Sequence, residues 1–230
     1  MATLHHYPLD PFSRRIRLWL AEHEINAELA DELPWAPRKP FLTLNSSGIL
    51  PVFVDDDGAA IIGVEAVSEY LEETRTSKGG KGSLLGSTPV QRAETRRLIA
   101  WFDVRFFREV GRPILTEKIE RRFAKPEQGG GAPNMTAVRA GLKNIRPHLS
   151  LIGALLEKRN WLAGDEFTSA DLAAAAHVSC IDYLGDVPWS ESDAAKDWYA
   201  RIKSRPTFRS LLADHIRGMP PPRSYADLDF

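Results

Sequence analysis

The chain has 230 residues, of which 43% are hydrophobic and 27% are charged, a composition typical of a soluble globular protein. No run reaches the roughly 18 apolar residues that a membrane-spanning helix needs, and a formal net charge of -1 argues against general affinity for nucleic acid. The opening MATLHHYPLD lacks the basic and apolar stretches of a secretory signal, so we expect a cytoplasmic protein with no direct membrane insertion.

Residues 1–73 have the sequence pattern of a small mixed α/β domain. The stretch ATLHHYP alternates like a strand, and FSRRIRLWLAEHEI then spaces its apolar residues like a helix. A second short strand is expected at AELADEL. The three prolines of PWAPRKP exclude regular helix and central strand there, which predicts an irregular loop.

The rest of this first domain predicts a hairpin followed by a helix. ILPVFVDDDGAAIIG contains two apolar runs on either side of an Asp-Gly turn, a strong short-range hairpin signal. VEAVSEYLEE then has the spacing of an amphipathic helix. The predicted order is therefore β-α-β, loop, β-β-α. A stretch rich in Gly, Lys and Ser predicts a linker over residues 74–87.

The rest of the chain has helical periodicity. From residue 88 to residue 123 an apolar stripe predicts a long helix, with a kink at Gly111-Arg112-Pro113. A second long helix contains Pro147, which implies a bend or a shifted boundary. We place the all-helical domain at residues 88–218 and an extended tail at residues 219–230.

One helix start inside this domain has a clear signature. Thr168 and Asp171 form a capping box before an apolar run, because each side chain can accept a hydrogen bond from an orphan backbone N–H. The helix that follows should be buried. Its lone cysteine, Cys180, lies in an apolar helical pattern and is predicted to pack in the core.

Four segments resemble, in order and spacing, the landmarks of the glutathione S-transferase superfamily: GILPVFVDDDGAAI, LLGSTPVQRAETRRLIAWFD, WLAGDEFTSADL and WYARIKSRPTF. The resemblance covers nearly the whole chain and implies a thioredoxin-like first domain, an all-helical second domain and a homodimer. It also implies that Pro51 is the family's cis-proline and that the Leu50 backbone pairs with the cysteinyl part of glutathione. A shared fold does not imply a shared reaction, so the catalytic residues must be checked one by one.

The group that activates the glutathione thiol is not matched. Aligning the loop PLDPFSRRIR with the family's serine-type motif puts Asp10 where the activating serine stands. An ionised carboxylate cannot donate a hydrogen bond, and its charge raises the pKa of a neighbouring thiol. Ser13 is an alternative donor; the competing interpretation is that Ser13 satisfies local backbone groups at the helix start.

The residues that hold the γ-glutamyl end are missing as well. In the family a Glu-Ser or Gln-Ser pair begins the helix after the hairpin, and alignment of AVSEYL sets Gly63 and Val64 at that pair. Loss of two hydrogen bonds to a charged ligand weakens binding by roughly two to four decades. The alternative is that Glu65 shifts in register and replaces the lost contact. We therefore expect weak or absent glutathione binding, no other cofactor and no catalytic residue.

The sequence also argues against a metal site. His5 and His6 are adjacent on a strand and point to opposite faces, and no other His, Cys or carboxylate cluster has metal-ligand spacing.

A transferase fold without its ligand-binding side chains favours a protein-binding scaffold over an enzyme. Within the superfamily, HHYPLDPFSRRIRL and SYADLDF resemble a branch of bacterial cell-division proteins. That resemblance implies binding to filaments of the tubulin-like protein FtsZ at the division site, and a link from those filaments to septal wall synthesis during constriction. The alternative is an active glutathione S-transferase or isomerase acting on small electrophiles. A nucleic-acid-binding module is a third class, which the near-neutral charge disfavours.

Two regions suit contact with an acidic filament. One is the basic segment from residue 92 to residue 125, which we call the basic helix. For each single arginine in it, i,i+4 ion pairs or dimer contacts are the alternative. The other is the proline-rich loop, whose tryptophan either anchors a partner or packs against its own domain. The candidate partner-binding residues are Trp35, Arg38, Lys39, Arg105, Arg108, Arg112, Lys118, Arg121 and Arg122.

The tail PPPRSYADLDF resembles a docking peptide, because a stiff polyproline lead precedes alternating apolar and acidic residues. In this interpretation Tyr225, Leu228 and Phe230 fill pockets on a partner such as the wall-synthesis machinery. Asp227 and Asp229 would then set the register. The alternative is that the tail folds back over its own helical domain.

Overall fold

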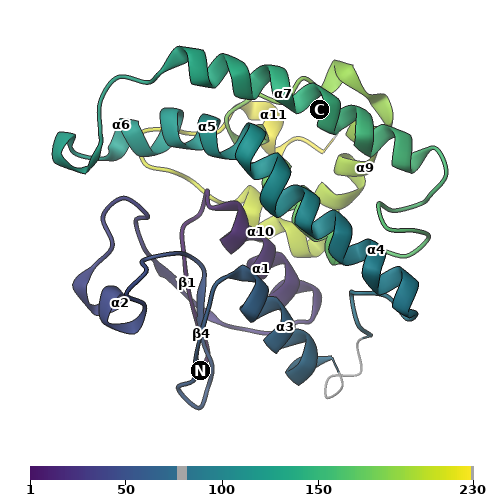
Figure 1. Ribbon diagram of the computed structural model, residues 1–230, viewed down its shortest axis with the longest axis horizontal. Coiled ribbons are helices and arrows are strands. Elements are labelled where there is room, and N and C mark those ends of the chain that lie inside the picture. Colours follow the sequence, from purple (N-terminus) through teal and green to yellow (C-terminus); the bar gives the residue numbers. More distant parts are fainter. Residues whose placement is uncertain (77–81, 229–230) are drawn as a thin grey trace. The chain divides into compact units, whose positions relative to one another are not determined.

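The computed structural model describes residues 1–76 and 82–228. The chain divides into two compact units, Met1–Ser83 and Leu84–Phe230 (Figure 1). The first contains a small mixed sheet with helices, and the second contains helices only. The predicted fold class, an α/β unit followed by an all-helical unit, is confirmed. Within the described ranges, no helix combines the length and the apolar character needed to cross a bilayer.

The sheet of the first unit has the strand order β2-β1-β3-β4. Its strands are β1 (Thr3–His6), β2 (Glu28–Asp31), β3 (Val52–Val54) and β4 (Ala60–Ile62). β1 pairs in parallel with β2 and antiparallel with β3, which pairs antiparallel with β4. Leu4 lies opposite Phe53 in the register of β1 and β3, and both side chains are fully buried. The predicted hairpin is confirmed, with Gly58 in the left-handed region (φ 88°) that this turn requires.

The helices of the first unit are α1 (Pro11–Glu22), α2 (Lys39–Leu44) and α3 (Val64–Arg75). The prediction that PWAPRKP contains no helical residue is wrong at its end. α2 begins with Lys39 and has Pro40 in its first turn. Proline is tolerated at that position because the N–H it lacks would have no partner within the helix.

The long predicted helix of the second unit is continuous in the structure, with two π-helical stretches. At the expected irregularity, the Arg112 N–H donates to the Phe107 carbonyl, the wider spacing of a π-helix. A side chain at Gly111 would place its Cβ only 2.9 Å from the Phe107 ring. The segments are α4 (Pro89–Ala100), π-helix η1 (Trp101–Gly111), α5 (Arg112–Leu115), π-helix η2 (Thr116–Glu120) and α6 (Arg121–Phe123).

The remaining helices complete the bundle. α7 runs without interruption through Pro147. The segments are α7 (Met135–Leu156), α8 (Ser169–Tyr183), α9 (Asp193–Lys203), α10 (Arg209–Leu212) and α11 (Arg223–Ala226), with short 3-10 turns at Pro126–Gln128, Trp189–Glu191 and Pro206–Phe208. The extended tail predicted from residue 219 is therefore wrong for α11.

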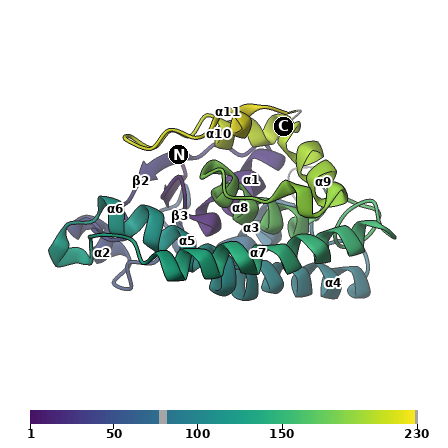
Figure 2. The same ribbon diagram turned by 90° about the horizontal axis from the view of Figure 1, so that it is seen from above.

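Every residue of α8 is buried, and Figure 2 shows α8 lying among the other helices of this unit. The predicted capping box is confirmed: the Thr168 hydroxyl accepts a hydrogen bond from the Ala170 N–H, and the Asp171 carboxylate accepts one from the Thr168 N–H at 3.0 Å. Cys180 is a free, buried cysteine, as expected for a packing residue.

Candidate functional site

The loop between β1 and α1 brings Asp10 and Ser13 into direct contact. Asp10 is the N-cap of α1, and its carboxylate accepts hydrogen bonds from the Ser13 N–H at 2.7 Å and the Ser13 hydroxyl at 2.6 Å. The Ser13 hydroxyl also lies 3.4 Å from the Tyr7 N–H and is completely buried. Because a hydroxyl has a single proton, Ser13 cannot donate to a thiolate while it donates to Asp10. These contacts support the interpretation of Ser13 as a residue that organises the helix start.

The hairpin places Leu50, Pro51, Gly63 and Val64 beside one another. The Leu50–Pro51 peptide bond is cis, as the resemblance implied. The Pro51 carbonyl accepts a hydrogen bond from the Gly63 N–H at 3.0 Å. Val64 begins α3, and no side chain caps this helix. The cis-proline that the resemblance implies is thus next to the start of α3, where positions 63 and 64 supply no polar side chain.

Glu65, the alternative ligand contact, lies next to an arginine of its own unit. Its carboxylate lies 3.5 Å from the guanidinium of Arg15, which is almost fully buried on α1, while the Glu65 side chain is largely exposed. Glu65 therefore already has a positively charged partner within the first unit. A ligand ammonium group would have to compete with that arginine.

The first unit exposes the apolar side chains of Leu42, Ile49 and Ile62, which we call the apolar rim. Ile49 is 55% exposed, and its Cδ1 lies 4.0 Å from the position a Cβ would take on Gly63. Leu42 lies similarly close to Gly48. Scattered apolar residues are normal on a surface, but a group of exposed apolar residues that lie close together suits a protein interface.

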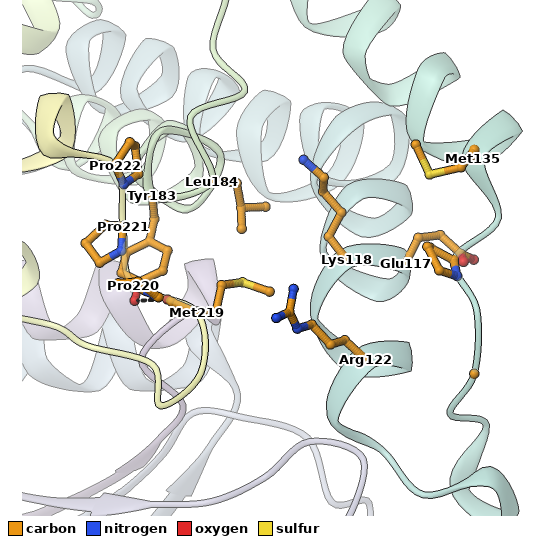
Figure 3. Close-up of a pocket in the computed structure, with 12 residues that line it drawn as sticks. Glu117, Lys118, Arg122, Met135, Tyr183, Leu184, Met219, Pro220, Pro221 and Pro222 are labelled. Atoms are coloured by element: carbon orange, nitrogen blue, oxygen red, sulfur yellow. Dashed lines mark hydrogen bonds between the residues drawn. The ribbon is translucent and has the colours of Figure 1, made fainter.

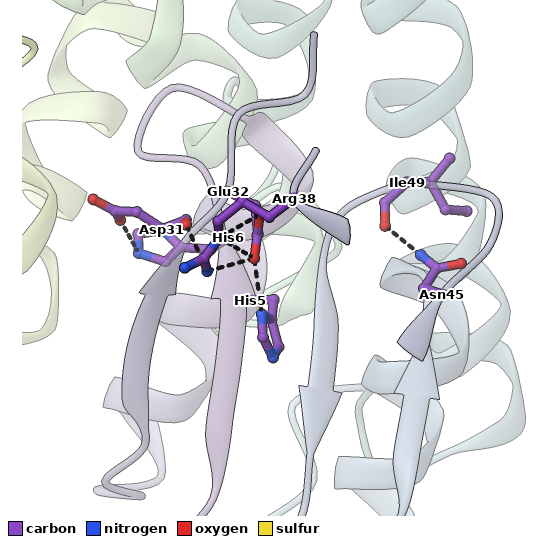
Figure 4. A network of polar contacts seen from close by, with 7 residues as sticks. All are labelled: His5, His6, Asp31, Glu32, Arg38, Asn45 and Ile49. Carbon is purple, nitrogen blue, oxygen red and sulfur yellow. Dashed lines mark hydrogen bonds and ion pairs between the residues drawn. The ribbon is translucent and has the colours of Figure 1, made fainter. Parts of the chain in front are cut away.

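The proline-rich loop is fixed by a polar network shown in Figure 4. Arg38 donates to the buried carboxylate of Glu32 at 2.6 Å, and His5 lies 3.6 Å from the same carboxylate. Burial alone would raise the pKa of Glu32, but the hydrogen bonds from Arg38 outweigh it and keep that pKa below its usual value. In the same network His6 lies 3.0 Å from Asp31.

The network decides the environment of the candidate residues in this loop. The charge of Arg38 is compensated by Glu32, whereas Lys39 is exposed at the start of α2. Trp35 is half-buried and packs edge-on against Tyr7, with ring centroids 5.2 Å apart. The interpretation that Trp35 packs against its own domain is thereby supported.

The first half of the basic helix is organised around Glu109. Its carboxylate accepts from Arg105 at 3.2 Å and from Arg108 at 3.1 Å, and it lies 3.2 Å from Nε2 of His148. Burial would raise the pKa of Glu109, but the two arginines outweigh it and lower that pKa. Burial also lowers the pKa of His148. Arg112 is exposed and forms no ion pair with any described residue.

The second half of the basic helix faces other partners. Lys118 forms an ion pair with Asp186 at 2.5 Å, and Arg121 pairs with Glu117 at 3.3 Å, four residues before it. Arg122 donates to the Gly218 carbonyl at 3.1 Å. The i,i+4 alternative therefore holds for Arg121, as it does for Arg105 with Glu109. The structure does not present the candidate arginines as one uncompensated cluster.

The tail is attached to its own unit at Tyr225, which is fully buried and donates from its hydroxyl to the Leu211 carbonyl at 2.9 Å. The buried ammonium of Lys203 donates to the Asp227 carbonyl at 2.7 Å and to the Ser224 carbonyl at 3.2 Å. Tyr225 is therefore wrong as a docking residue, because its ring already fills a core position. Leu228 is exposed; Asp229 and Phe230 lie outside the described residues.

Sequence reasoning missed two features of the helical unit. Lys203 is a buried cation that holds the tail, although its sequence context reads as an ordinary exposed helix end. A pocket of about 740 Å³ also lies between the tail and the end of the basic helix. No local sequence pattern indicates the buried Lys203 or the pocket, because both depend on contacts between segments far apart in the chain. In the described residues no group of three or more His, Cys, Asp or Glu side chains could hold a metal ion.

The sequence of the chain is similar to those of known proteins. Residues 11–74 match the family described as glutathione S-transferase, N-terminal domain, and residues 116–206 match glutathione S-transferase, C-terminal domain. The chain is 46% identical over 231 residues to FtsZ-localized protein A of Caulobacter vibrioides, covering 99% of this chain and 98% of that protein. It is 29% identical to glutathione S-transferase 3 of Zea mays, covering 98% and 100%.

Solved structures with similar sequences have the same fold as this chain. FzlA from C. crescentus superposes with a TM-score of 0.93 at 45% identity, covering 100% of this chain and 99% of that chain. A protein described as a glutathione S-transferase from Sinorhizobium meliloti 1021 superposes with a TM-score of 0.95 at 48% identity, with both chains covered completely.

Proposed function

The chain belongs to the glutathione S-transferase family, and we propose that it is a non-catalytic member that binds FtsZ filaments and promotes constriction at the division site. The full-length similarity to a protein named FtsZ-localized protein A supports this proposal. The alternative, an active glutathione S-transferase or isomerase, draws support from the relatives that carry that description.

The contact between Asp10 and Ser13 is the observation that favours the scaffold over the enzyme. A transferase of this family lowers the pKa of the glutathione thiol by donating a hydrogen bond to the thiolate. Here the hydroxyl of Ser13 donates to Asp10 at 2.6 Å instead. A negative charge on Asp10 would also raise the pKa of a thiol placed nearby. Together with Gly63 and Val64, this arrangement supports weak or absent glutathione binding and no catalytic residue.

We infer that the surface around Leu50 and the apolar rim suits a protein ligand. The Leu50 backbone and the apolar rim offer hydrogen bonds to an extended segment and apolar contacts to its side chains. Trp35 adds an aromatic side chain held in place by packing on Tyr7. The exposed guanidinium groups of Arg108 and Arg112 would attract an acidic filament surface. A homodimer would bind a polymer more tightly through avidity, and the tail from Leu228 onward would contact the wall-synthesis machinery.

Calorimetry with glutathione tests the non-catalytic part of this proposal. We expect no saturable binding at micromolar concentrations, and no turnover of a general electrophile. Micromolar binding together with turnover would overturn the scaffold interpretation in favour of the enzyme.

Co-sedimentation with FtsZ polymers tests the partner. We expect wild-type protein to pellet with the polymers, and Ile49→Asp to reduce the affinity about tenfold or more, because a buried unpaired charge opposes docking at the rim. Charge reversal at Arg108 and Arg112 together should also reduce pelleting. The matched control reverses Arg139 and Lys143, which are exposed on α7 and form no ion pair with described residues. Equal loss in both double variants would count against a specific basic face.

A further inference from the structure

The helical unit contains a pocket of about 740 Å³ that the proposed function does not use (Figure 3). Its volume lies within the roughly 300–1,000 Å³ of small-molecule sites. One wall is the end of the basic helix with the start of α7, and the other is the end of α8 with the tail. The lining residues all belong to Leu84–Phe230 and are Glu117, Lys118, Arg122, Gly131, Pro133, Met135, Tyr183, Leu184 and Met219–Pro222.

Most of the lining is apolar and shaped by methionine and proline. Met135 and Met219 come from opposite walls, and Leu184 lies between the tail and the basic helix. Methionine side chains adapt to ligands of different shape because they are unbranched and polarizable. Such a surface favours a ligand with an elongated apolar body.

The polar side chains of the pocket are predominantly cationic. Figure 3 shows Lys118 and Arg122 pointing toward Leu184 and Met219, whereas Glu117 points toward the Met135 side. The Glu117 carboxylate already accepts a hydrogen bond from the Asn134 N–H at 2.6 Å and pairs with Arg121. The charge of Glu117 is thus compensated by groups on the same side of the pocket.

The charges around the pocket leave one cation without an acidic partner. Lys118 is compensated by Asp186 at 2.5 Å, and Glu117 is compensated by Arg121. Arg122 donates to a neutral backbone carbonyl, that of Gly218, and to no carboxylate among the described residues. Because a guanidinium binds a carboxylate through paired hydrogen bonds, this balance favours a singly charged anion.

Hydrogen bonds within the protein hold the walls of the pocket in place before a ligand binds. The Tyr183 hydroxyl donates to the Met219 carbonyl at 2.9 Å and accepts from the Ile216 N–H at 2.8 Å. Further along the tail, Tyr225 is buried and Lys203 holds two backbone carbonyls. A preformed pocket costs little conformational entropy on binding.

We propose that this pocket binds an amphipathic monocarboxylate, with the carboxylate on Arg122 beside Lys118 and an aliphatic body along Leu184 and Met219. Decanoate is a suitable probe, and 1-decanol is its uncharged counterpart. Isothermal titration calorimetry should give saturable binding of one decanoate per chain, about tenfold or more tighter than binding of decanol. Arg122→Met should bring the decanoate affinity down to the level of decanol.

The location of the site is tested separately from its charge. Met219→Asp should abolish binding of both probes, because it places an acid in the apolar wall. Lys143→Met is the matched control, since Lys143 is an exposed cation on α7 outside the pocket, and it should bind decanoate like the wild type. Circular dichroism establishes that each variant is folded. The proposal is wrong if wild-type protein shows no saturable decanoate binding, or if folded Arg122→Met and Met219→Asp variants bind decanoate as the wild type does.

Discussion

Substitution of Tyr225 distinguishes a tail that is part of the fold from a tail that is a mobile docking peptide. The ring of Tyr225 is fully buried and packs edge-on against Tyr183, with centroids 5.2 Å apart. Its hydroxyl donates to the Leu211 carbonyl at 2.9 Å. Tyr225→Ala removes the ring and leaves a cavity, a change that costs about 3–5 kcal/mol in protein cores. Tyr225→Phe removes only the hydrogen bond and should cost about 1–2 kcal/mol.

Thermal unfolding followed by circular dichroism measures these costs. A loss of 1 kcal/mol lowers the Tm of a chain of this size by about 2–4 °C, so Tyr225→Ala should lower it by roughly 6–20 °C and Tyr225→Phe by roughly 2–8 °C. Leu228→Ala is the control within the tail, because Leu228 is exposed, and it should leave Tm within about 1–2 °C of the wild type. A Tm for Tyr225→Ala close to that of Leu228→Ala would refute the buried position of Tyr225.

Three further predictions concern the acid groups and caps. Arg97 and Arg159 hold the pKa of Glu94 at about 2. In urea titrations, wild type should therefore be more stable than Glu94→Gln by about 1–3 kcal/mol above pH 4.5, and this difference should disappear as the pH falls toward 2. A difference that is independent of pH would contradict the ion pair. Thr168→Ala should cost about 1–2 kcal/mol in chemical denaturation because it removes the cap of α8, and Thr168→Ser should restore most of it. Ser13→Ala should lower stability by about 1 kcal/mol without changing any residual transferase turnover; a selective loss of turnover would identify Ser13 as the thiol-activating residue after all.

The two units differ in what their interactions offer a partner. In the first unit Ser13 donates to Asp10, and Arg38 donates to Glu32. The surface left for a ligand is mainly the apolar rim and the backbone at Leu50. In the second unit, by contrast, Arg122 faces a pocket with no acidic partner. The two proposed roles, a protein-binding surface on the first unit and a small-molecule pocket in the second, therefore rest on different features: exposed apolar side chains in the first and a cation without an acidic partner in the second.

Several features could be predicted from the sequence because they depend on residues close together in the chain. The capping box at Thr168 and Asp171 and the hairpin around Gly58 each need only a few neighbouring residues. The absence of ligand-holding side chains at Gly63 and Val64 could likewise be found by aligning a short helix start. α2 was missed because its apolar stretch is only one turn long and follows a proline-rich segment.

Tertiary structure alone decided the features that join distant segments. Tyr225 meets Leu211 and Tyr183, and Lys118 meets Asp186, 68 residues away. Neither partner could be assigned from residue types, because the tail has the same composition whether it docks on another protein or on its own helices. The sequence therefore determined the fold class, and its alignment places Gly63 and Val64 where the family resemblance implies a ligand-holding pair. Packing determined which cations remain uncompensated, since the charge that faces each arginine depends on which helix or tail segment lies against it.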